Sequence, residues 1–135
     1  MDLDGKDRVQ RLAMRPAVYV HGNDSLRQVA TTLVEESIGA ALVRGPHGAS
    51  GIVSERDLVR AISDGADPDR TRAADVMSEE MVMVEPGDDV LAAAHRMLDN
   101  EVRHLPVIQD DVTYGMVSAR DALRALVEAR EAAGA

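Results

Sequence analysis

Two short segments of this sequence carry the side chains best suited to hold a small ligand. Residues 51–57 read Gly-Ile-Val-Ser-Glu-Arg-Asp, and residues 115–121 read Gly-Met-Val-Ser-Ala-Arg-Asp. In both segments a serine stands three residues before an aspartate, which is the spacing of a capping box at the start of a helix. An aspartate in that place can also accept two hydrogen bonds from a ribose diol, and a helix start favours a phosphate group. The spacing therefore predicts two helix starts and two candidate sites for a phosphorylated ligand.

The two segments belong to a longer internal repeat. Residues 20–62 match residues 84–126 at an offset of 64 positions, and no gap is needed. One seven-residue match can arise by chance, but a collinear match of this length cannot. The chain is therefore a tandem duplication, and each copy carries one candidate site.

Each copy has the pattern of a strand, a helix, two strands and a second helix. Short β-branched runs and turn residues alternate with apolar residues at helical spacing. These elements fall at residues 18–20, 26–34, 39–43, 51–53 and 55–62 of the first copy, and at residues 81–84, 90–98, 104–108, 115–117 and 119–132 of the second. The first helix of each copy is capped by Asp24 or Ser25, and by Asp88 or Asp89, respectively.

The two copies are expected to depend on each other. The sheet of one copy has only about three strands, which is too small to be stable alone. We therefore expect an α/β (α+β) protein in which two β-α-β-β-α units pack sheet to sheet and share one core. Between the copies, residues 63–70 form a polar linker, and Thr71 is expected to cap a short helix at residues 72–77.

Composition excludes several classes of protein. The 135 residues carry a formal net charge of −9 and include two Tyr but no Phe, Trp or Cys. Nucleic-acid binding needs a basic face or stacking rings, so no nucleic-acid partner is expected. The lack of cysteine excludes disulfides and thiolate chemistry. Apolar residues reach 45%, but no 18-residue apolar run and no signal peptide are present, so we expect a folded cytoplasmic protein that does not contact a membrane.

The duplicated unit resembles a tandem pair of cystathionine-β-synthase (CBS) domains, often called a Bateman module. The resemblance rests on Ala-Asp-Val-Met-Ser at residues 74–78, Arg-His-Leu-Pro-Val-Ile at residues 103–108, and Gly-x-Val-Ser-x-Arg-Asp in both copies. It implies a first CBS unit at residues 9–66, a linker with a short helix at residues 67–76, and a second CBS unit at residues 77–130. It also implies pseudo-two-fold symmetry. The chain is most similar to stand-alone actinobacterial CBS-domain proteins.

The resemblance implies a set of ligand-binding residues, carried over by position. In CBS pairs the matching Ser or Thr and the Asp hold the ribose of an adenine nucleotide in the cleft between the two units. That role falls to Ser54 and Asp57 for one cleft, and to Ser118 and Asp121 for the other. The expected effector is AMP, ATP or S-adenosylmethionine, and no cofactor is obligatory.

Basic residues near the two segments are candidates for contact with phosphate. Arg56 and Arg120 fall on the first turns of the expected helices, where the alternative is a solvated side chain. In nucleotide-binding members of the family, the positions before the Pro-Val strand often carry basic side chains, here Arg103 and His104. The first copy has Gly-Ala at the equivalent residues 39–40, so the two clefts are chemically unequal.

Adenine is expected to contact apolar walls near the first strand of each copy. Val20 and Val84 are the candidates, and the alternative for both is a place in the hydrophobic core. No metal site is expected, because His21, His47 and His95 have no partner at metal-ligand spacing.

These residues predict a non-catalytic regulatory module that signals by changing the geometry between its units or within a dimer. The alternative is a structural or interaction protein with degenerate, ligand-free clefts, which residues 39–40 favour for one cleft. No Ser-His-Asp order, Walker-type loop, His-x-x-x-His motif or carboxylate pair indicates an enzyme. No protein partner can be named from the sequence.

A homodimer is expected, because pairs of this kind commonly associate through their helices. The last helix of the second copy carries small and aliphatic residues suited to close packing between helices. These are Leu123, Leu126 and Val127, beside Ala122, Ala125 and Ala129.

Overall fold

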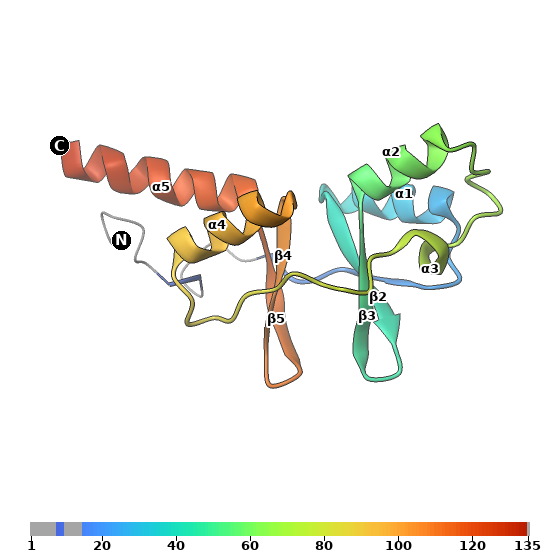
Figure 1. The fold of residues 1–135 in the computed structure, drawn as a ribbon, viewed down its shortest axis with the longest axis horizontal. Coiled ribbons are helices and arrows are strands. Elements are labelled where there is room, and N and C mark those ends of the chain that lie inside the picture. Colours follow the sequence, from blue (N-terminus) through green and yellow to red (C-terminus); the bar gives the residue numbers. More distant parts are fainter. Residues whose placement is uncertain (1–7, 10–14, 135) are drawn as a thin grey trace. The chain divides into compact units, whose positions relative to one another are not determined.

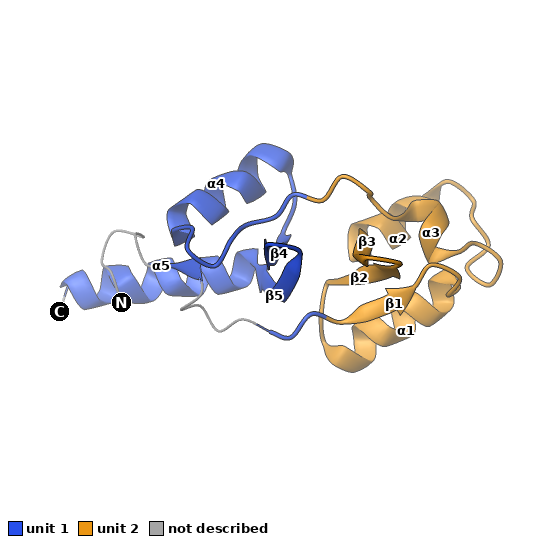
Figure 2. Ribbon diagram, turned by 90° about the horizontal axis from the view of Figure 1, so that it is seen from below, with its two compact units in different colours: residues 1–17, 82–135 blue, residues 18–81 orange. Residues whose placement is uncertain are grey.

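Each copy of the repeat folds as a mixed α/β unit, which confirms the predicted fold class. The computed structural model describes residues 8–9 and 15–134. It divides into two compact units, which Figure 2 shows in different colours. The first-copy unit comprises residues 18–81, and the second-copy unit comprises residues 1–17 and 82–135. None of the described helices is both long and apolar enough to cross a membrane.

The first-copy unit is built on a three-stranded sheet. Its elements are β1 (Tyr19–His21), α1 (Leu26–Glu36), β2 (Ala40–Gly45), β3 (Gly48–Ser54), α2 (Glu55–Ser63) and α3 (Ala73–Val76), as shown in Figure 1. β1 runs parallel to β2, and β2 runs antiparallel to β3, so β2 is the central strand. The first five elements follow the predicted β-α-β-β-α order.

In its described residues, the second-copy unit lacks the first strand and otherwise follows the same order. Its elements are α4 (Val90–Asn100), β4 (His104–Gln109), β5 (Val112–Ser118) and α5 (Ala119–Gly134). β4 and β5 form an antiparallel hairpin. The strand predicted at residues 81–84 is wrong, because Val84 forms only an isolated parallel bridge with Val107.

Pro106 explains why this sheet lacks a third strand. In the first copy the Leu42 N–H donates to the Val18 carbonyl at 2.9 Å and so anchors the start of β1. Pro106 occupies the equivalent position on β4 and has no N–H to donate. The Val84 N–H still donates to the Pro106 carbonyl at 3.0 Å, and the Ile108 N–H to the Val84 carbonyl at 2.9 Å. These two bonds hold the bridge but do not extend it into a strand.

Short polar side chains set the helix starts. Ser25 caps α1 in a capping box and Asp89 caps α4, so the second residue of each predicted pair is the cap. The predicted cap at Thr71 is wrong: α3 follows Arg72, whose N–H donates to the Asp75 carboxylate at 2.9 Å. The Thr71 carbonyl instead accepts the first N–H of α1 at 3.0 Å, so this residue belongs to the contact between the linker and α1.

Each unit is completed by a segment that lies N-terminal to the other copy. Ala73, which precedes the second copy, is fully buried in the first-copy core, and its N–H donates to the Asp24 carbonyl at 2.8 Å. Val9, 64 positions earlier in the chain, is fully buried in the second-copy core. Its N–H donates to the Asp88 carbonyl, also at 2.8 Å. The buried residues form two clusters, one in each unit. A core shared between the two copies stays a prediction.

Candidate functional site

The first candidate site is the turn from β3 into α2, here called the Ser54 turn. Asp57 Oδ2 accepts hydrogen bonds from the Ser54 N–H at 2.8 Å and from the Ser54 hydroxyl at 3.0 Å. Ser54 Oγ in turn accepts the Asp57 N–H at 3.3 Å. These reciprocal bonds satisfy two amides that the helix start would leave unpaired, so the predicted capping box is confirmed.

The turn from β5 into α5, here called the Ser118 turn, has the same geometry. Asp121 Oδ2 accepts the Ser118 N–H at 2.8 Å and the Ser118 hydroxyl at 2.9 Å, and Ser118 Oγ accepts the Asp121 N–H at 3.1 Å. Both serines and both aspartates are half-buried. In the part of the chain that the structure describes, Oδ1 of neither aspartate accepts a hydrogen bond. Each carboxylate therefore keeps one acceptor atom for a further donor.

Two backbone amides at each of the two helix starts are already used. The Glu55 N–H donates to the Gly39 carbonyl at 2.9 Å, and the Ala119 N–H donates to the Arg103 carbonyl at 2.7 Å. The amides of the two aspartates are bound by the serine hydroxyls, as described above. Fewer helix amides are therefore left for a phosphate group at either turn than the helix start alone would offer.

The structure places Arg103 and His104 beside the Ser118 turn. His104 and Ser118 are direct partners across β4 and β5, so their side chains share one face of the hairpin. Arg103 is tied to the first residue of α5 through its carbonyl, and its side chain is exposed. Arg120 is exposed on the first turn of α5. The second copy thus gathers three basic residues around Ser118 and Asp121.

The corresponding corner of the first copy has less positive charge. Ala40 is the partner of Ser54 across β2 and β3, where the second copy has His104. Gly39 stands in the place of Arg103. Arg56, exposed on the first turn of α2, is the one predicted basic residue on this corner. The chemical difference between the two copies is therefore built into the residues next to each turn.

Val20 and Val84 lie in the hydrophobic cores of their units. Val20 is 3% exposed and Val84 is fully buried. This confirms the core role that was the alternative for both residues, while contact with adenine stays a prediction. Among the described residues, no group of three His, Asp or Glu side chains is arranged to hold a metal ion.

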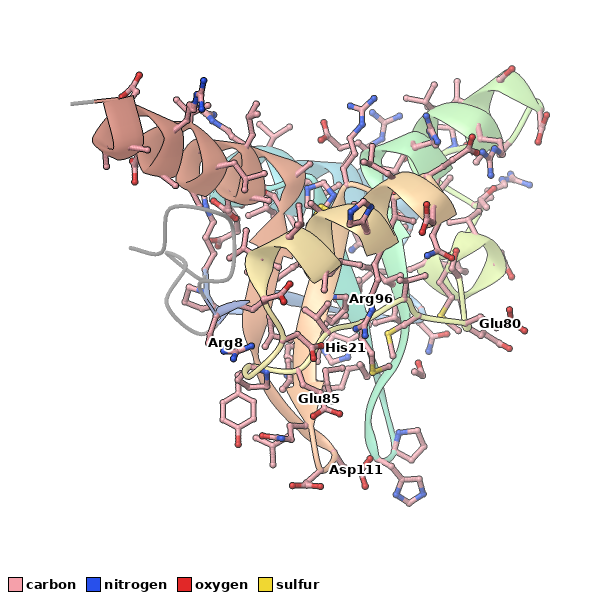
Figure 3. The ribbon with its side chains drawn as sticks, turned by 60° about the vertical axis from the view of Figure 1, so that its left-hand side comes forward. Arg8, His21, Glu80, Glu85, Arg96 and Asp111 are labelled. Atoms are coloured by element: carbon pink, nitrogen blue, oxygen red, sulfur yellow. The ribbon has the colours of Figure 1, made fainter. Side chains whose placement is uncertain are left out.

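Sequence reasoning missed the polar contacts that α1 and α4 make with loop residues. Arg96 on α4, which is labelled in Figure 3, donates from one guanidinium nitrogen to the Met83 carbonyl at 2.8 Å and to the Asp88 carboxylate at 3.1 Å. Arg27 at the start of α1 binds the Asp69 carboxylate, with one contact at 3.0 Å. This hydrogen bond raises the pKa of Arg27 and lowers the pKa of Asp69. No local spacing signals these pairs, because their partners come from loops that the fold brings near.

Comparison with known proteins identifies the repeat. The family model of the CBS domain matches residues 9–64 and 73–128. The chain is 37% identical over 111 residues to the mitochondrial CBS domain-containing protein CBSX3 of Arabidopsis thaliana. The match covers 78% of this chain and 54% of that protein, so the chain spans about half the length of this curated relative.

Solved structures show the same fold. The CBS-domain containing protein ATU1752 from Agrobacterium tumefaciens is 27% identical, with a TM-score of 0.83 over 88% of this chain and 98% of that one. The CBS domain pair of protein MJ0100, solved in complex with 5′-methylthioadenosine and S-adenosyl-L-methionine, is 20% identical. Its TM-score is 0.82 over 90% of this chain and 97% of that one. These matches confirm the resemblance inferred from the repeat: the chain belongs to the CBS domain family and consists of two CBS domains in tandem.

Proposed function

We propose that this chain is a non-catalytic regulatory module that binds an adenine nucleotide or a related adenosyl ligand at its two serine turns. The observation that carries the proposal is the geometry of Asp57 and Asp121. Each aspartate closes a helix start with Oδ2 and keeps Oδ1 available at a half-buried position. A charged acceptor held rigidly in this way suits the diol of a ribose.

The chemistry of the turns supports ribose as the anchored group. A hydrogen bond to a charged acceptor contributes about 1.5–3 kcal/mol. The serine hydroxyl already donates to the carboxylate and accepts one N–H, which leaves it one lone pair for a ligand hydroxyl. The MJ0100 domain pair holds adenosyl ligands in the same fold. For this chain, the ligand is inferred from its own two turns.

The residues beside the turns favour different ligands in the two copies. Arg103 and Arg120 give the Ser118 turn positive charge for a phosphate group, and His104 adds a side chain that can donate a hydrogen bond. The Ser54 turn has Gly39 and Ala40 in place of two of them. We assign a phosphorylated ligand such as AMP or ATP to the second copy, and an adenosyl ligand with no phosphate, such as S-adenosylmethionine, to the first.

Exposed apolar side chains support the predicted homodimer. Val34 and Leu98 are 78% and 75% exposed at equivalent positions of α1 and α4, and Val59 and Leu123 are 68% and 62% exposed on α2 and α5. The alanine face of α5 is different: Ala122, Ala125 and Ala129 are buried inside the second-copy unit. The part of the dimer prediction that used these alanines is therefore wrong, because they already pack within their own unit.

The proposal is tested by thermal shift with AMP, ATP, adenosine and S-adenosylmethionine. A ligand at 100 times its dissociation constant should stabilise the protein by about 2.7 kcal/mol. Asp57→Asn and Asp121→Asn should each remove the shift of one ligand class. Asparagine can keep the bond to the serine N–H through its oxygen, but its NH₂ group cannot accept from a ribose hydroxyl.

Asp75→Asn is the matched control. Asp75 also accepts the N–H of a helix N-cap, at the start of α3, but it lies outside both serine turns. This variant should keep every ligand shift. If none of the four ligands stabilises the wild-type protein, the proposed binding of an adenosyl ligand fails and the structural-protein alternative is favoured.

A further inference from the structure

The chain crosses between its two units twice, after residue 17 and after residue 81. At both crossings the adjoining segment is hydrogen-bonded to the strand that leads into a serine turn. Ser78 and Ile52 of β3 exchange two backbone hydrogen bonds, at 2.9 and 3.0 Å. Arg15 and Met116 of β5 likewise exchange two, at 3.0 and 3.3 Å. We call residues 77–81 and residues 15–17 the crossing segments.

The two attachments use equivalent residues of β3 and β5. Ile52 and Met116 are 64 residues apart, and each lies two residues before the serine of its turn. Both attachments are isolated antiparallel bridges rather than strands. Each attachment consists of a single pair of backbone hydrogen bonds, which can form or break without unfolding a sheet. In the first crossing segment, Met77 also packs against the first-copy core.

Gly51 shows how closely the first crossing segment lies against β3. A Cβ atom at this position would lie 2.8 Å from Met77 Sδ and 2.8 Å from the Ser78 carbonyl oxygen. Real Cβ atoms do not approach backbone oxygens this closely, so only glycine allows the contact. The crossing segment is thus in direct contact with the strand at its attachment.

A continuous path of bonds joins the ligand atom to the crossing segment. Asp57 Oδ1 is the atom proposed to accept from the ligand, and Oδ2 of the same carboxylate accepts the Ser54 N–H at 2.8 Å. Only Val53, which is fully buried, stands between Ser54 and Ile52. A ligand that fixes the carboxylate also fixes the Ser54 peptide and hence the end of β3. Ile52, two residues before Ser54 on β3, forms the backbone bridge to Ser78.

We infer that each serine turn controls the order of one crossing segment, so that ligand binding at the turn strengthens the bridge between strand and segment. The inference rests on the proposed function, because the ligand at the turn is the signal. In this account, the Ser54 turn acts on residues 77–81, and the Ser118 turn acts on residues 15–17. Each copy therefore acts on a different one of the two segments that connect the units.

The first arm of the test needs no ligand. Amide hydrogen exchange of the full chain is measured by NMR for wild type, Ser54→Ala and Ser118→Ala. Ser54→Ala should speed exchange at Ile52 and Ser78 at least about fivefold, the lower end of usual couplings between sites, and leave Arg15 and Met116 unchanged. Ser118→Ala, the matched control, should do the reverse. Because Ser54→Ala also lowers the stability of the unit, the increase at Ile52 and Ser78 is measured relative to Leu33 in α1. An increase at Leu33 as large as that at Ile52 and Ser78 would mean simple destabilisation and would overturn the inference.

The second arm adds AMP, adenosine and S-adenosylmethionine, each at saturation, to wild type and Gly51→Ala. A ligand bound at the Ser54 turn should slow exchange at Asp57, Ile52 and Ser78 together in wild type. In Gly51→Ala it should still slow Asp57 but no longer Ser78. Gly87→Ala is the control, because no atom lies near a Cβ at that position.

The outcomes separate the inference from the proposed function. Slower exchange at Asp57 with no change at Ile52 and Ser78 would overturn the coupling and leave ligand binding intact. If no ligand changes exchange anywhere, the proposed function fails, and the serine variants of the first arm still decide whether turn and crossing segment are coupled.

Discussion

In Asp57 and in Asp121, the two oxygens of the carboxylate have different proposed roles, one in capping the helix and one in binding a ligand. Oδ2 accepts the serine N–H and hydroxyl and closes the helix start. Oδ1 accepts no hydrogen bond from the residues that the structure describes, and it is the atom proposed to accept from a ligand. The capping and ligand-binding interpretations of the Ser-x-x-Asp spacing are therefore compatible, because each uses a different atom. This division also means that the turn is preorganised, so that a ligand need not order it on binding.

Ser54→Ala should lower the free energy of unfolding by about 1 kcal/mol, the usual cost of removing an N-cap side chain. The variant loses the acceptor of the Asp57 N–H and one donor to the Asp57 carboxylate. Urea denaturation followed by circular dichroism measures the change. Ser63→Ala, at the last residue of α2, is the control and should change stability by less than about 0.5 kcal/mol. Equal stability of Ser54→Ala and wild type would show that the box contributes nothing.

Arg103→Ala should weaken AMP binding about tenfold, corresponding to the loss of one charge-assisted hydrogen bond. Adenosine binding should not change, because adenosine has no phosphate for the guanidinium to contact. Isothermal titration calorimetry with both ligands measures the difference. Arg130→Ala, exposed further along α5, is the matched control. An equal loss for AMP and adenosine would contradict the assignment of Arg103 to phosphate.

The elements could largely be predicted from spacing. Apolar periodicity located α1 and α4, and the Ser-x-x-Asp spacing located the starts of α2 and α5. The strand predicted at residues 81–84 did not form for a physical reason. A β-branched run pairs as a strand only if the backbone N–H groups of the neighbouring strand can donate to it. The neighbour is Pro106, and that missing N–H is visible in the sequence only once the pairing of the strands is known.

Leu98→Glu combined with Leu123→Glu should convert a dimer to a monomer. Both side chains are exposed on helices of the second-copy unit, and a buried charge at an apolar interface is costly. Sedimentation velocity at micromolar concentration measures the change. Glu128→Gln, exposed on α5, is the control and should leave the dimer intact. A monomeric wild-type protein would contradict the dimer.

At the scale of the whole molecule, the exchange of segments between copies could not be predicted. The repeat shows that Val9 and Ala73 are equivalent, but it does not say which unit each residue joins. Both cores offer a similar aliphatic site, and the connections of the chain would allow Val9 and Ala73 to enter either core. The structure places each residue in the core of the other copy's unit. For the same reason, the position of Arg103 and His104 beside the Ser118 turn required the pairing of β4 with β5.

Val9→Ala should destabilise the second-copy unit by roughly 2 kcal/mol, at the lower end of large-to-small changes in a core. Val9 is fully buried although it precedes the first copy in sequence. Hydrogen exchange should therefore speed up in α4 and β5 and not in α1 and β2. Val59→Ala, at a position that is 68% exposed, serves as the control. Faster exchange confined to the first-copy unit would contradict the placement of Val9.

The measurement that tests the central claim most directly is an NMR titration of the full chain with AMP. If the serine turns bind the ligand, the amide resonances of Ser118 and Asp121 shift and saturate, and those of Arg103 and His104 shift with them. Asp121→Asn abolishes these shifts, whereas Asp75→Asn keeps them. Saturable shifts confined to residues away from both serine turns, or no shift at millimolar AMP, adenosine and S-adenosylmethionine, would contradict the account.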